Sequence, residues 1–300
     1  MDNNILIKDL KSLISIPSYG SEEKVAAYII KRLKLEGFKP KKDKYGNVLL
    51  EIGKGPGFLL NAHMDTVGIE GWKERALKPV EKQGRIYGRG ASDTKSGIAT
   101  LLYIAGQLKD AKLKRRLIFL FSVHEEDSRM EQNGSFLAVK NIDATQGLMM
   151  EPTFKGNKLG IGVGCKGACR FKITVKGRPC HSSKPHLGVN PIYLADDFIK
   201  DFKKIRQLKK TYSILGKKVN LCSVSTITQI KAEEGKNLVP SKCEISIDCR
   251  ILPGQDSKEV VNTIDSLCKK HFKLGYEIDS YCNNGYFGYD RSMLGLIRKV

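Results

Sequence analysis

An unbroken apolar run, LIFLFSV at residues 117–123, ends just before a pair of adjacent carboxylates, Glu125 and Glu126. A run of this kind is typical of a strand that is buried on both faces of a sheet. Similar strand patterns, separated by helical ones, occur elsewhere in the first half of the chain. The strands are expected at 47–52, 57–62 and 147–150, and the helices at 4–35, 92–110 and 131–140. This alternation predicts an α/β fold with a mostly parallel sheet flanked by helices.

The pattern changes after residue 163. The segment ACRFKITVKG, at 168–177, alternates apolar and polar residues, which indicates a half-exposed antiparallel strand. Further strands are expected at 219–231 and 242–252, and helices at 191–209 and 256–271. We therefore expect residues 1–163 to form the first part of an α/β domain and residues 164–272 to form an inserted α+β domain. A chain of 300 residues is long enough for two domains.

The formal net charge of +20 admits two interpretations, a polyanion partner or a solvated lysine-rich surface. The lysines are spread along the chain without interleaved aromatic residues, which favours the solvated surface and no nucleic-acid partner. No stretch approaches the roughly 18–20 apolar residues of a membrane helix, so no membrane partner is expected. Eight cysteines without a CxxC pair indicate mostly buried thiols in a reducing compartment. Together with an N-terminus that lacks a secretory pattern, this predicts a cytoplasmic protein.

Histidine and carboxylate side chains follow the predicted strands or precede a helix. They are His63, Asp65, Asp93, Glu125, Glu126 and Glu151. In open α/β sheets, ligands bind beyond the carboxyl ends of the strands, so these distant residues can share one crevice. Several carboxylates in one crevice repel each other unless a cation is present. One imidazole with several carboxylates suits Zn²⁺, with Mn²⁺ or Co²⁺ as alternatives, and one aspartate can bridge two ions.

Taken singly, each of these residues has an ordinary alternative. His63 could be a structural histidine and Asp93 a helix N-cap. Glu125 and Glu126 could be loop acids, and Glu151, before Pro152, a turn residue. Their shared position at strand ends favours the metal site. The segment HEEDS does not fit the HExxH pattern, which excludes that zinc helix.

Five motifs in this order resemble those of a known family over nearly the whole chain. They are HMDTVG, YGRGASDTKSG, HEE, EPT and GRPCHSSKPHLGVNP. The sequence is similar to the dizinc amidohydrolases that include acetylornithine deacetylase, succinyl-diaminopimelate desuccinylase, aminoacylase and carboxypeptidase G. The resemblance implies two Zn²⁺ per subunit in a zinc-exopeptidase-like fold.

The same resemblance implies roles for the matching residues. His63 and Glu151 would bind one metal, Asp93 would bridge, and Glu126 would bind the other. Glu125 would act as general base and then as general acid, so that adjacent glutamates at one strand end serve different tasks. Asp65 would orient His63.

The domain at 164–272 matches the family's lid, which is also its dimerisation domain, so a homodimer is expected. In relatives, the histidine matching His181 reaches across the dimer to steady the oxyanion. Asn237 and Arg250, in NLVPSKCEISIDCRILPG, would bind the substrate's carbonyl or carboxylate. Without the resemblance, His181 is an ordinary loop histidine and Arg250 a surface strand cation.

In this family the chain returns from the lid to the catalytic domain and supplies a final histidine ligand to the second metal. Residues 273–300 would be that return, but no matching histidine follows His186; His271 lies in a predicted lid helix, outside any motif. We therefore expect a truncated catalytic domain, either a fragment of a longer product or an impaired form.

Three hypotheses follow for the function. The first is a dimetal hydrolase that cleaves the amide bond of small N-acyl amino acids, with a di- or aminopeptidase of the same family as its close alternative. The second is an inactive binding or scaffold protein that lacks the last metal ligand. The third, nucleic-acid binding through the positive charge, predicts an affinity that falls steeply with salt.

Overall fold

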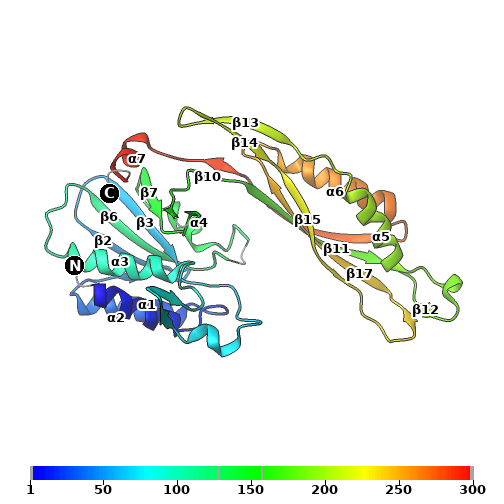
Figure 1. Cartoon of the computed structure of the whole chain (residues 1–300), viewed down its shortest axis with the longest axis horizontal. Coiled ribbons are helices and arrows are strands. Elements are labelled where there is room, and N and C mark those ends of the chain that lie inside the picture. The colour runs from blue at the N-terminus through cyan, green and yellow to red at the C-terminus, as the bar shows by residue number, and fades with distance from the viewer. Residues whose placement is uncertain (1–2, 127–128, 157, 298–300) are drawn as a thin grey trace. The chain divides into compact units, whose positions relative to one another are not determined.

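The structure, a computed structural model, describes residues 3–126, 129–156 and 158–297 (Figure 1). The chain divides into two compact units, 1–161 and 162–300. Each unit has its own hydrophobic core. None of the helices in the described part of the chain is long and apolar enough to cross a membrane.

The first unit is built on a five-stranded sheet in the order β1-β2-β6-β3-β7. The strands are β1 (Lys41–Lys42), β2 (Val48–Ile52), β3 (Gly57–His63), β6 (Arg116–Ser122) and β7 (Gln146–Met149). Strands β6, β3 and β7 run parallel, whereas β2 pairs antiparallel with both β6 and β1. The sheet is therefore mixed, and its parallel part is the part whose strands end together.

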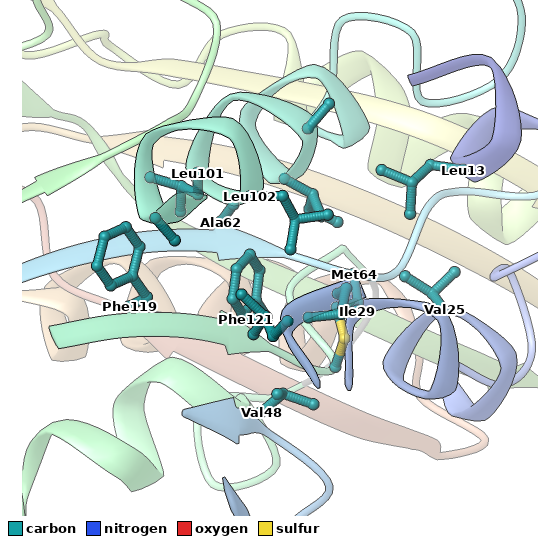
Figure 2. Close-up of a cluster of buried hydrophobic side chains, with 14 of the residues drawn as sticks. Leu13, Val25, Ile29, Val48, Ala62, Met64, Leu101, Leu102, Phe119 and Phe121 are labelled. Carbon is teal, nitrogen blue, oxygen red and sulfur yellow. The ribbon is translucent and has the colours of Figure 1, made fainter. Parts of the chain in front are cut away.

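Helices cover this sheet with an apolar surface. They are α1 (Asn3–Ile14), α2 (Glu23–Leu35), α3 (Lys95–Gln107) and the short α4 (Gly134–Val139). Figure 2 shows Ile29 and Leu102 from the helices close to Phe121 of β6. The single helix expected at 4–35 is two helices, because Pro17 lacks an amide donor and disfavours helical geometry at the preceding residue.

The second unit contains an antiparallel four-stranded sheet in the order β15-β17-β11-β18. The strands are β11 (Gly167–Lys176), β15 (Val224–Lys231), β17 (Lys242–Ile251) and β18 (Tyr276–Asn283). Helices α5 (Pro191–Phe202) and α6 (Ser257–His271) pack on it, and Phe198 and Ile264 of these helices join its core. Strand β18 pairs along the length of β11 in this sheet. This strand belongs to the segment 273–300, for which the sequence predicts a return to the catalytic domain.

Short elements complete the chain. In the first unit they are β4 (Val80–Lys82), β5 (Arg85–Tyr87), β8 (Phe154–Lys155), β9 (Lys158–Leu159) and the 3-10 helix Lys73–Leu77. In the second they are β10 (Gly164–Cys165), β12 (Cys180–His181), β13 (Lys209–Ile214), β14 (Lys217–Cys222), β16 (Leu238–Val239), β19 (Tyr286–Phe287), α7 (Arg291–Ile297) and the 3-10 helix Pro185–Leu187.

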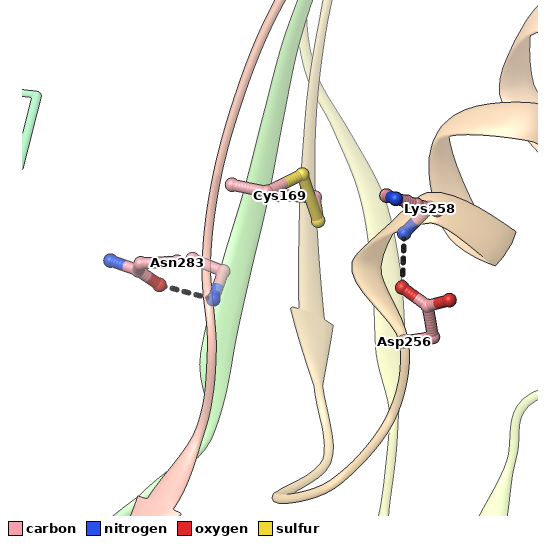
Figure 3. The surroundings of a disulfide bond; sticks show 6 residues. Cys169, Asp256, Lys258 and Asn283 are labelled. Carbon is pink, nitrogen blue, oxygen red and sulfur yellow. Dashed lines mark hydrogen bonds between the residues drawn. A yellow bond between two sulfur atoms is a disulfide. The ribbon is translucent and has the colours of Figure 1, made fainter.

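The cysteines differ from the expected set of mostly buried thiols, because Cys165 is exposed and Cys180 and Cys222 are only partly buried. Cys169 on β11 and Cys282 on β18 form a disulfide (Figure 3), and the other six cysteines are free. The two cysteines are 113 residues apart in the sequence, so no short cysteine spacing predicts the pair. They meet because β11 and β18 are neighbours in register.

Candidate metal centre

The parallel strands of the first unit end at one edge of the sheet, and the predicted metal ligands of this unit gather there. His63 is the last residue of β3, and Glu151 follows β7 by two residues. Glu125 and Glu126 follow β6, which pairs with β3. Asp93 lies two residues before α3.

His63 lies at the centre of this group. Its side chain is only 2% exposed, and its Nε2 atom lies 2.9 Å from Asp93 Oδ1 and 3.2 Å from Glu151 Oε1. Its Nδ1 atom lies 3.0 Å from the Asp65 backbone oxygen and 3.4 Å from Asp65 Oδ1. The imidazole is thus fixed on one side and presented to two carboxylates on the other.

The Asp65 carboxylate also holds the turn that carries the paired glutamates. Its Oδ2 atom accepts hydrogen bonds of 2.8 Å from the backbone amides of both Glu125 and Glu126. Asp65 is 7% exposed, so these bonds are largely shielded from water. One buried carboxylate therefore connects the end of β3 with the segment after β6.

A second carboxylate, which the sequence did not single out, holds the same turn from another side. Glu22, at the N-cap of α2, is 8% exposed. Its Oε1 atom accepts a 3.2 Å hydrogen bond from the His124 backbone amide and lies 3.2 Å from His124 Nδ1. His124 has a φ of +56°, a left-handed conformation that is uncommon for a residue other than glycine. No sequence pattern signals this turn, because it depends on a contact with a distant helix.

Helix α3 is held close to the end of β7 by small and polar residues. Thr94 Oγ1 donates a 2.7 Å hydrogen bond to the backbone oxygen of Met150, next to Glu151. A Cβ atom at Gly97 would lie 2.6 Å from Met150 Cβ, so only glycine permits this approach. Asp93 was also a candidate helix cap, but Thr94 occupies the N-cap and the Asp93 carboxylate contacts His63.

Lys95 anchors the beginning of the same helix and was also not foreseen. It is fully buried, and its Nζ atom donates hydrogen bonds to the backbone oxygens of Leu13 (3.0 Å) and Ile16 (2.6 Å). Burial lowers the pKa of this ammonium group to about 8. The carbonyls at the end of α1 thus receive a donor from the helix that follows Asp93.

The pKa values in this cluster indicate that its carboxylates stabilise a positive charge placed among them. Burial opposes protonation of His63, but its hydrogen bonds to Asp65, Asp93 and Glu151 outweigh it and raise the His63 pKa to about 12. The hydrogen bond to His63 lowers the pKa of Asp93. Burial, together with the Asp93 charge, raises the pKa of Glu126 to about 7. Burial also raises the pKa of Glu125. The cluster therefore provides carboxylates that need a cation between them.

The donor set fits a divalent cation. One ligand atom each from His63, Asp93 and Glu126 lie within 4.8 Å of one another, and the same holds for His63, Glu125 and Glu151. A mixed imidazole and carboxylate set suits Zn²⁺, and also Mn²⁺ or Co²⁺. The two sets share His63, and Glu125 lies close enough to join one of them.

The three candidate residues of the second unit do not all lie together. His181 Nδ1 lies 2.8 Å from Ser183 Oγ and 3.2 Å from the Ser183 backbone nitrogen. Nε2 lies 3.4 Å from the Asn237 side-chain amide. Asn237 lies shortly before Lys242, the first residue of β17, whereas Arg250 lies near the other end of that strand. At 3.3 Å per residue, Arg250 is about 26 Å along the strand from Lys242. It forms an ion pair with Asp248 at 2.7 Å. The structure thus groups His181 with Asn237 and leaves Arg250 apart within this unit.

Two family models match the chain. One describes a peptidase dimerisation domain and matches residues 163–275, and the other describes peptidase family M28 and matches residues 47–156. A probable succinyl-diaminopimelate desuccinylase of Staphylococcus aureus is 30% identical over 73% of this chain and 62% of its own length. The chain belongs to the dizinc peptidase and amidohydrolase family. The family is one of metal-dependent hydrolases, so the predicted family and enzyme class are confirmed.

Other relatives agree with this family. An uncharacterised metallohydrolase of Methanocaldococcus jannaschii is 29% identical over 93% of this chain and 75% of its own length. The chain thus spans between 62% and 75% of the length of these two curated relatives.

Solved structures show the same fold. A metallo-carboxypeptidase of the M20 family from Sulfolobus solfataricus has a TM-score of 0.73 at 20% identity, covering 95% of this chain and 79% of that one. The aminopeptidase PepT of Bacillus cereus has a TM-score of 0.68 at 19% identity, covering 100% and 81%. The predicted α/β class with a second, dimerisation-type domain is confirmed.

Proposed function

We propose that this dizinc-family chain hydrolyses the amide bond of a small N-acyl amino acid. The observation that supports it best is the convergence of His63, Asp93, Glu126 and Glu151, from four separate segments, around the space that Glu125 also faces. In this proposal His63 and Glu151 would hold one cation, Glu126 would hold the second, and Asp93 would serve both.

Divalent cations held there would polarise the amide carbonyl and acidify the attacking water. Glu125 is the general base of the proposal. Burial raises its pKa, which brings its proton affinity closer to that needed near neutral pH. It would take a proton from the attacking water and then pass that proton to the departing nitrogen. Asp65, through the Glu125 and Glu126 amides, would keep the two glutamates in their different orientations.

The second unit would serve substrate recognition and dimerisation. The His181 ring would steady the developing oxyanion, and Asn237, whose side-chain amide lies 3.4 Å from its Nε2 atom, would support that role. Arg250 would bind a substrate carboxylate. The matched peptidase dimerisation domain supports a homodimer formed through this unit. Sedimentation equilibrium of the purified chain tests the homodimer, and a monomer across micromolar concentrations would contradict it.

We propose N-acetylated or N-succinylated basic amino acids as the substrates. The 30% identity to a probable succinyl-diaminopimelate desuccinylase supports an acylated amino acid. A di- or aminopeptidase activity is the second candidate. It is favoured by the shared fold of an aminopeptidase and of the dipeptidase Dug1p of Saccharomyces cerevisiae. The same water could attack either kind of amide.

The deciding experiment combines metal analysis with a hydrolysis assay. The purified chain, loaded with Zn²⁺, is incubated with N-acetyl and N-succinyl amino acids and with dipeptides, and the released amine is measured. The variant Glu125→Gln should lower the rate by about 10²- to 10⁴-fold without changing the metal content. Glu131→Gln, which alters an exposed glutamate in the following loop, is the matched control and should keep full activity.

The outcomes separate the alternatives. If the chain binds Zn²⁺ and releases amine only from dipeptides, the peptidase candidate stands and the deacylase does not. If the chain retains no metal and stays inactive with added Zn²⁺, the hypothesis of an inactive binding or scaffold protein stands instead. Full activity in Glu125→Gln would contradict the proposed base.

A further inference from the structure

Three cysteines form a row across the sheet of the second unit. Cys169 on β11 lies directly opposite Cys282 on β18 and directly opposite Cys249 on β17. Residues directly opposite each other in a sheet share one face, so the three sulphur atoms lie on the same side. That side is the one packed against α5 and α6, because Cys169 and Cys249 belong to the core there. Cys169 and Cys282 form the disulfide, and their Cα atoms are 4.1 Å apart.

The two sulphur atoms of this disulfide differ in accessibility. Cys169 is fully buried, whereas Cys282 is partly exposed. Cys282 lines a pocket of about 350 Å³ between β18 and the first turns of α6. The other lining residues are Ser257, Lys258, Val261, Asn262 and Ser280. A reagent in this pocket would therefore reach Cys282 and not Cys169.

The lining of the pocket indicates which reagent it suits. Ser257, Asn262 and Ser280 offer hydrogen-bonding groups, and Lys258 is the one charged residue among the described residues that line it. The Asp256 carboxylate accepts a 2.9 Å hydrogen bond from the Lys258 backbone amide and starts α6 (Figure 3). Glu259, the residue after Lys258, lies in the first turn of the helix but is not among the described residues that line the pocket. A pocket of this size takes a small molecule rather than a protein segment. A pocket that combines hydrogen-bonding groups with one ammonium group favours a small molecule with a carboxylate.

We propose that Cys282 is a thiolation site at which a small anionic thiol, such as a cysteine-containing peptide, opens the Cys169–Cys282 disulfide. The thiolate of the small molecule attacks the Cys282 sulphur and forms a new disulfide with it. The Cys169–Cys282 bond breaks, and Cys169 leaves as a thiolate that takes up the proton lost by the attacking thiol. The exchange needs no other oxidant or reductant, and its reverse, attack by Cys169 on Cys282, releases the small thiol.

Cys249 does not replace Cys282 in this exchange. It lies on the other side of Cys169 in the row and is 1% exposed. Burial raises the pKa of the Cys249 thiol, so little of it is thiolate, the form that attacks a disulfide. The freed Cys169 therefore has the mixed disulfide on Cys282 as its productive partner.

Peptide mapping of the full chain under non-reducing conditions tests the proposal. The protein is incubated anaerobically with reduced glutathione, a tripeptide thiol with a net negative charge, and free thiols are alkylated only after the reaction. The expected product carries glutathione on Cys282 and has a free thiol at Cys169. Reduced thiols do not add to one another, so the free Cys222, which is partly exposed, serves as an internal control and should carry no adduct.

The charge preference is tested with variants and with other thiols. Lys258→Gln should slow the reaction with glutathione by about two- to fivefold, the usual effect of one exposed charge. The reaction with uncharged 2-mercaptoethanol should be unchanged. Lys269→Gln, in the last turn of the same helix, is the matched control and should react as the parent chain does.

Three results would overturn the proposal. They are free thiols at both Cys169 and Cys282 before any thiol is added, an adduct on a cysteine other than Cys282, and equal glutathione rates for the parent chain and Lys258→Gln. The test does not involve amide hydrolysis, so the two proposals stand or fall separately.

Discussion

Asp65 connects the histidine and the glutamates of the candidate centre. Its backbone oxygen contacts His63, and its carboxylate accepts the amides of Glu125 and Glu126. The family resemblance implies for Asp65 only the orientation of His63. The structure adds the contact with the paired glutamates, which depends on a hydrogen bond that spans about sixty positions of the chain.

Removing the Asp65 carboxylate should destabilise the first unit and weaken metal binding. In Asp65→Ala two shielded amides lose their acceptor, and we expect the free energy of unfolding to fall by about 2–4 kcal/mol. Urea unfolding in a chelator measures this loss, and calorimetry with Zn²⁺ measures the affinity. Asp143→Ala, at a side chain that is 92% exposed, is the control and should change little. Equal unfolding curves for Asp65→Ala and the parent chain would refute the connection.

Glu126 should make Zn²⁺ affinity depend on pH. Its pKa is raised to about 7 in the metal-free cluster, mainly by burial, and a ligand carboxylate must be deprotonated. Zn²⁺ affinity should therefore increase as the pH rises from about 6 to about 8. The pKa of Glu126 is higher in the folded, metal-free protein than in the unfolded chain. The stability that the protonated Glu126 contributes to the metal-free protein is therefore lost as the pH rises through about 7.

Titrations of Zn²⁺ at several pH values, in buffers of different ionisation enthalpy, measure both the affinity and the protons released. In Glu126→Gln the affinity should be lower and its dependence on pH in this range shallower. An affinity of the parent chain that does not change between these pH values would contradict the assignment.

At the scale of elements, the close approach of α3 to the end of β7 determines how Asp93 and Glu151 meet. The approach depends on Gly97, since a Cβ atom there would lie 2.6 Å from Met150 Cβ and 3.1 Å from the Met150 backbone oxygen. The hydrogen bond from Thr94 to that oxygen reinforces the contact. Two metal-ligand candidates on different elements are thus positioned by one helix–strand contact.

Gly97→Ala should push the first turn of α3 away from β7 and lower Zn²⁺ affinity by at least about tenfold, within the range seen when residues that support metal ligands are lost. Gly106→Ala, on the same helix, is the matched control. Its new Cβ atom would meet only side-chain atoms of Glu36, at 3.7 Å or more, and alanine favours the helix. Equal affinities in the two variants would show that the contact does not position the ligands.

Elements that are buried on both faces could be predicted closely from the sequence. The strands expected at 57–62 and 117–123 are β3 (Gly57–His63) and β6 (Arg116–Ser122). The gathering of His63, Glu126 and Glu151 also followed from their positions at strand ends, and that of Asp93 from its position before a helix. What could not be predicted depends on tertiary contacts: the left-handed turn at His124, held by Glu22, and the pairing of β18 with β11.

At the scale of the whole molecule, each of the two units has its own core, and the metal-ligand candidates lie in the first. Zn²⁺ should therefore stabilise the first unit directly. At about a thousand times its dissociation constant, a ligand that binds only the folded form adds about 4 kcal/mol.

Hydrogen exchange followed by mass spectrometry measures this effect for each segment. With Zn²⁺, protection should increase in β3, β6 and β7 and remain unchanged in β11 and β17, and a chelator should reverse it. Protection that increases equally in both units would contradict the assignment of the metal site to the first unit.

The ligand candidates come from segments that are joined by whole helices and strands, because β3, β6 and β7 are parallel and each crossover is long. Contacts of this kind have a high contact order and form late in folding. An unfolded or half-folded chain therefore offers no complete set of donors, and the ion can be captured only after the parallel strands have paired. Capture at that stage slows the unfolding of the native protein without speeding its formation.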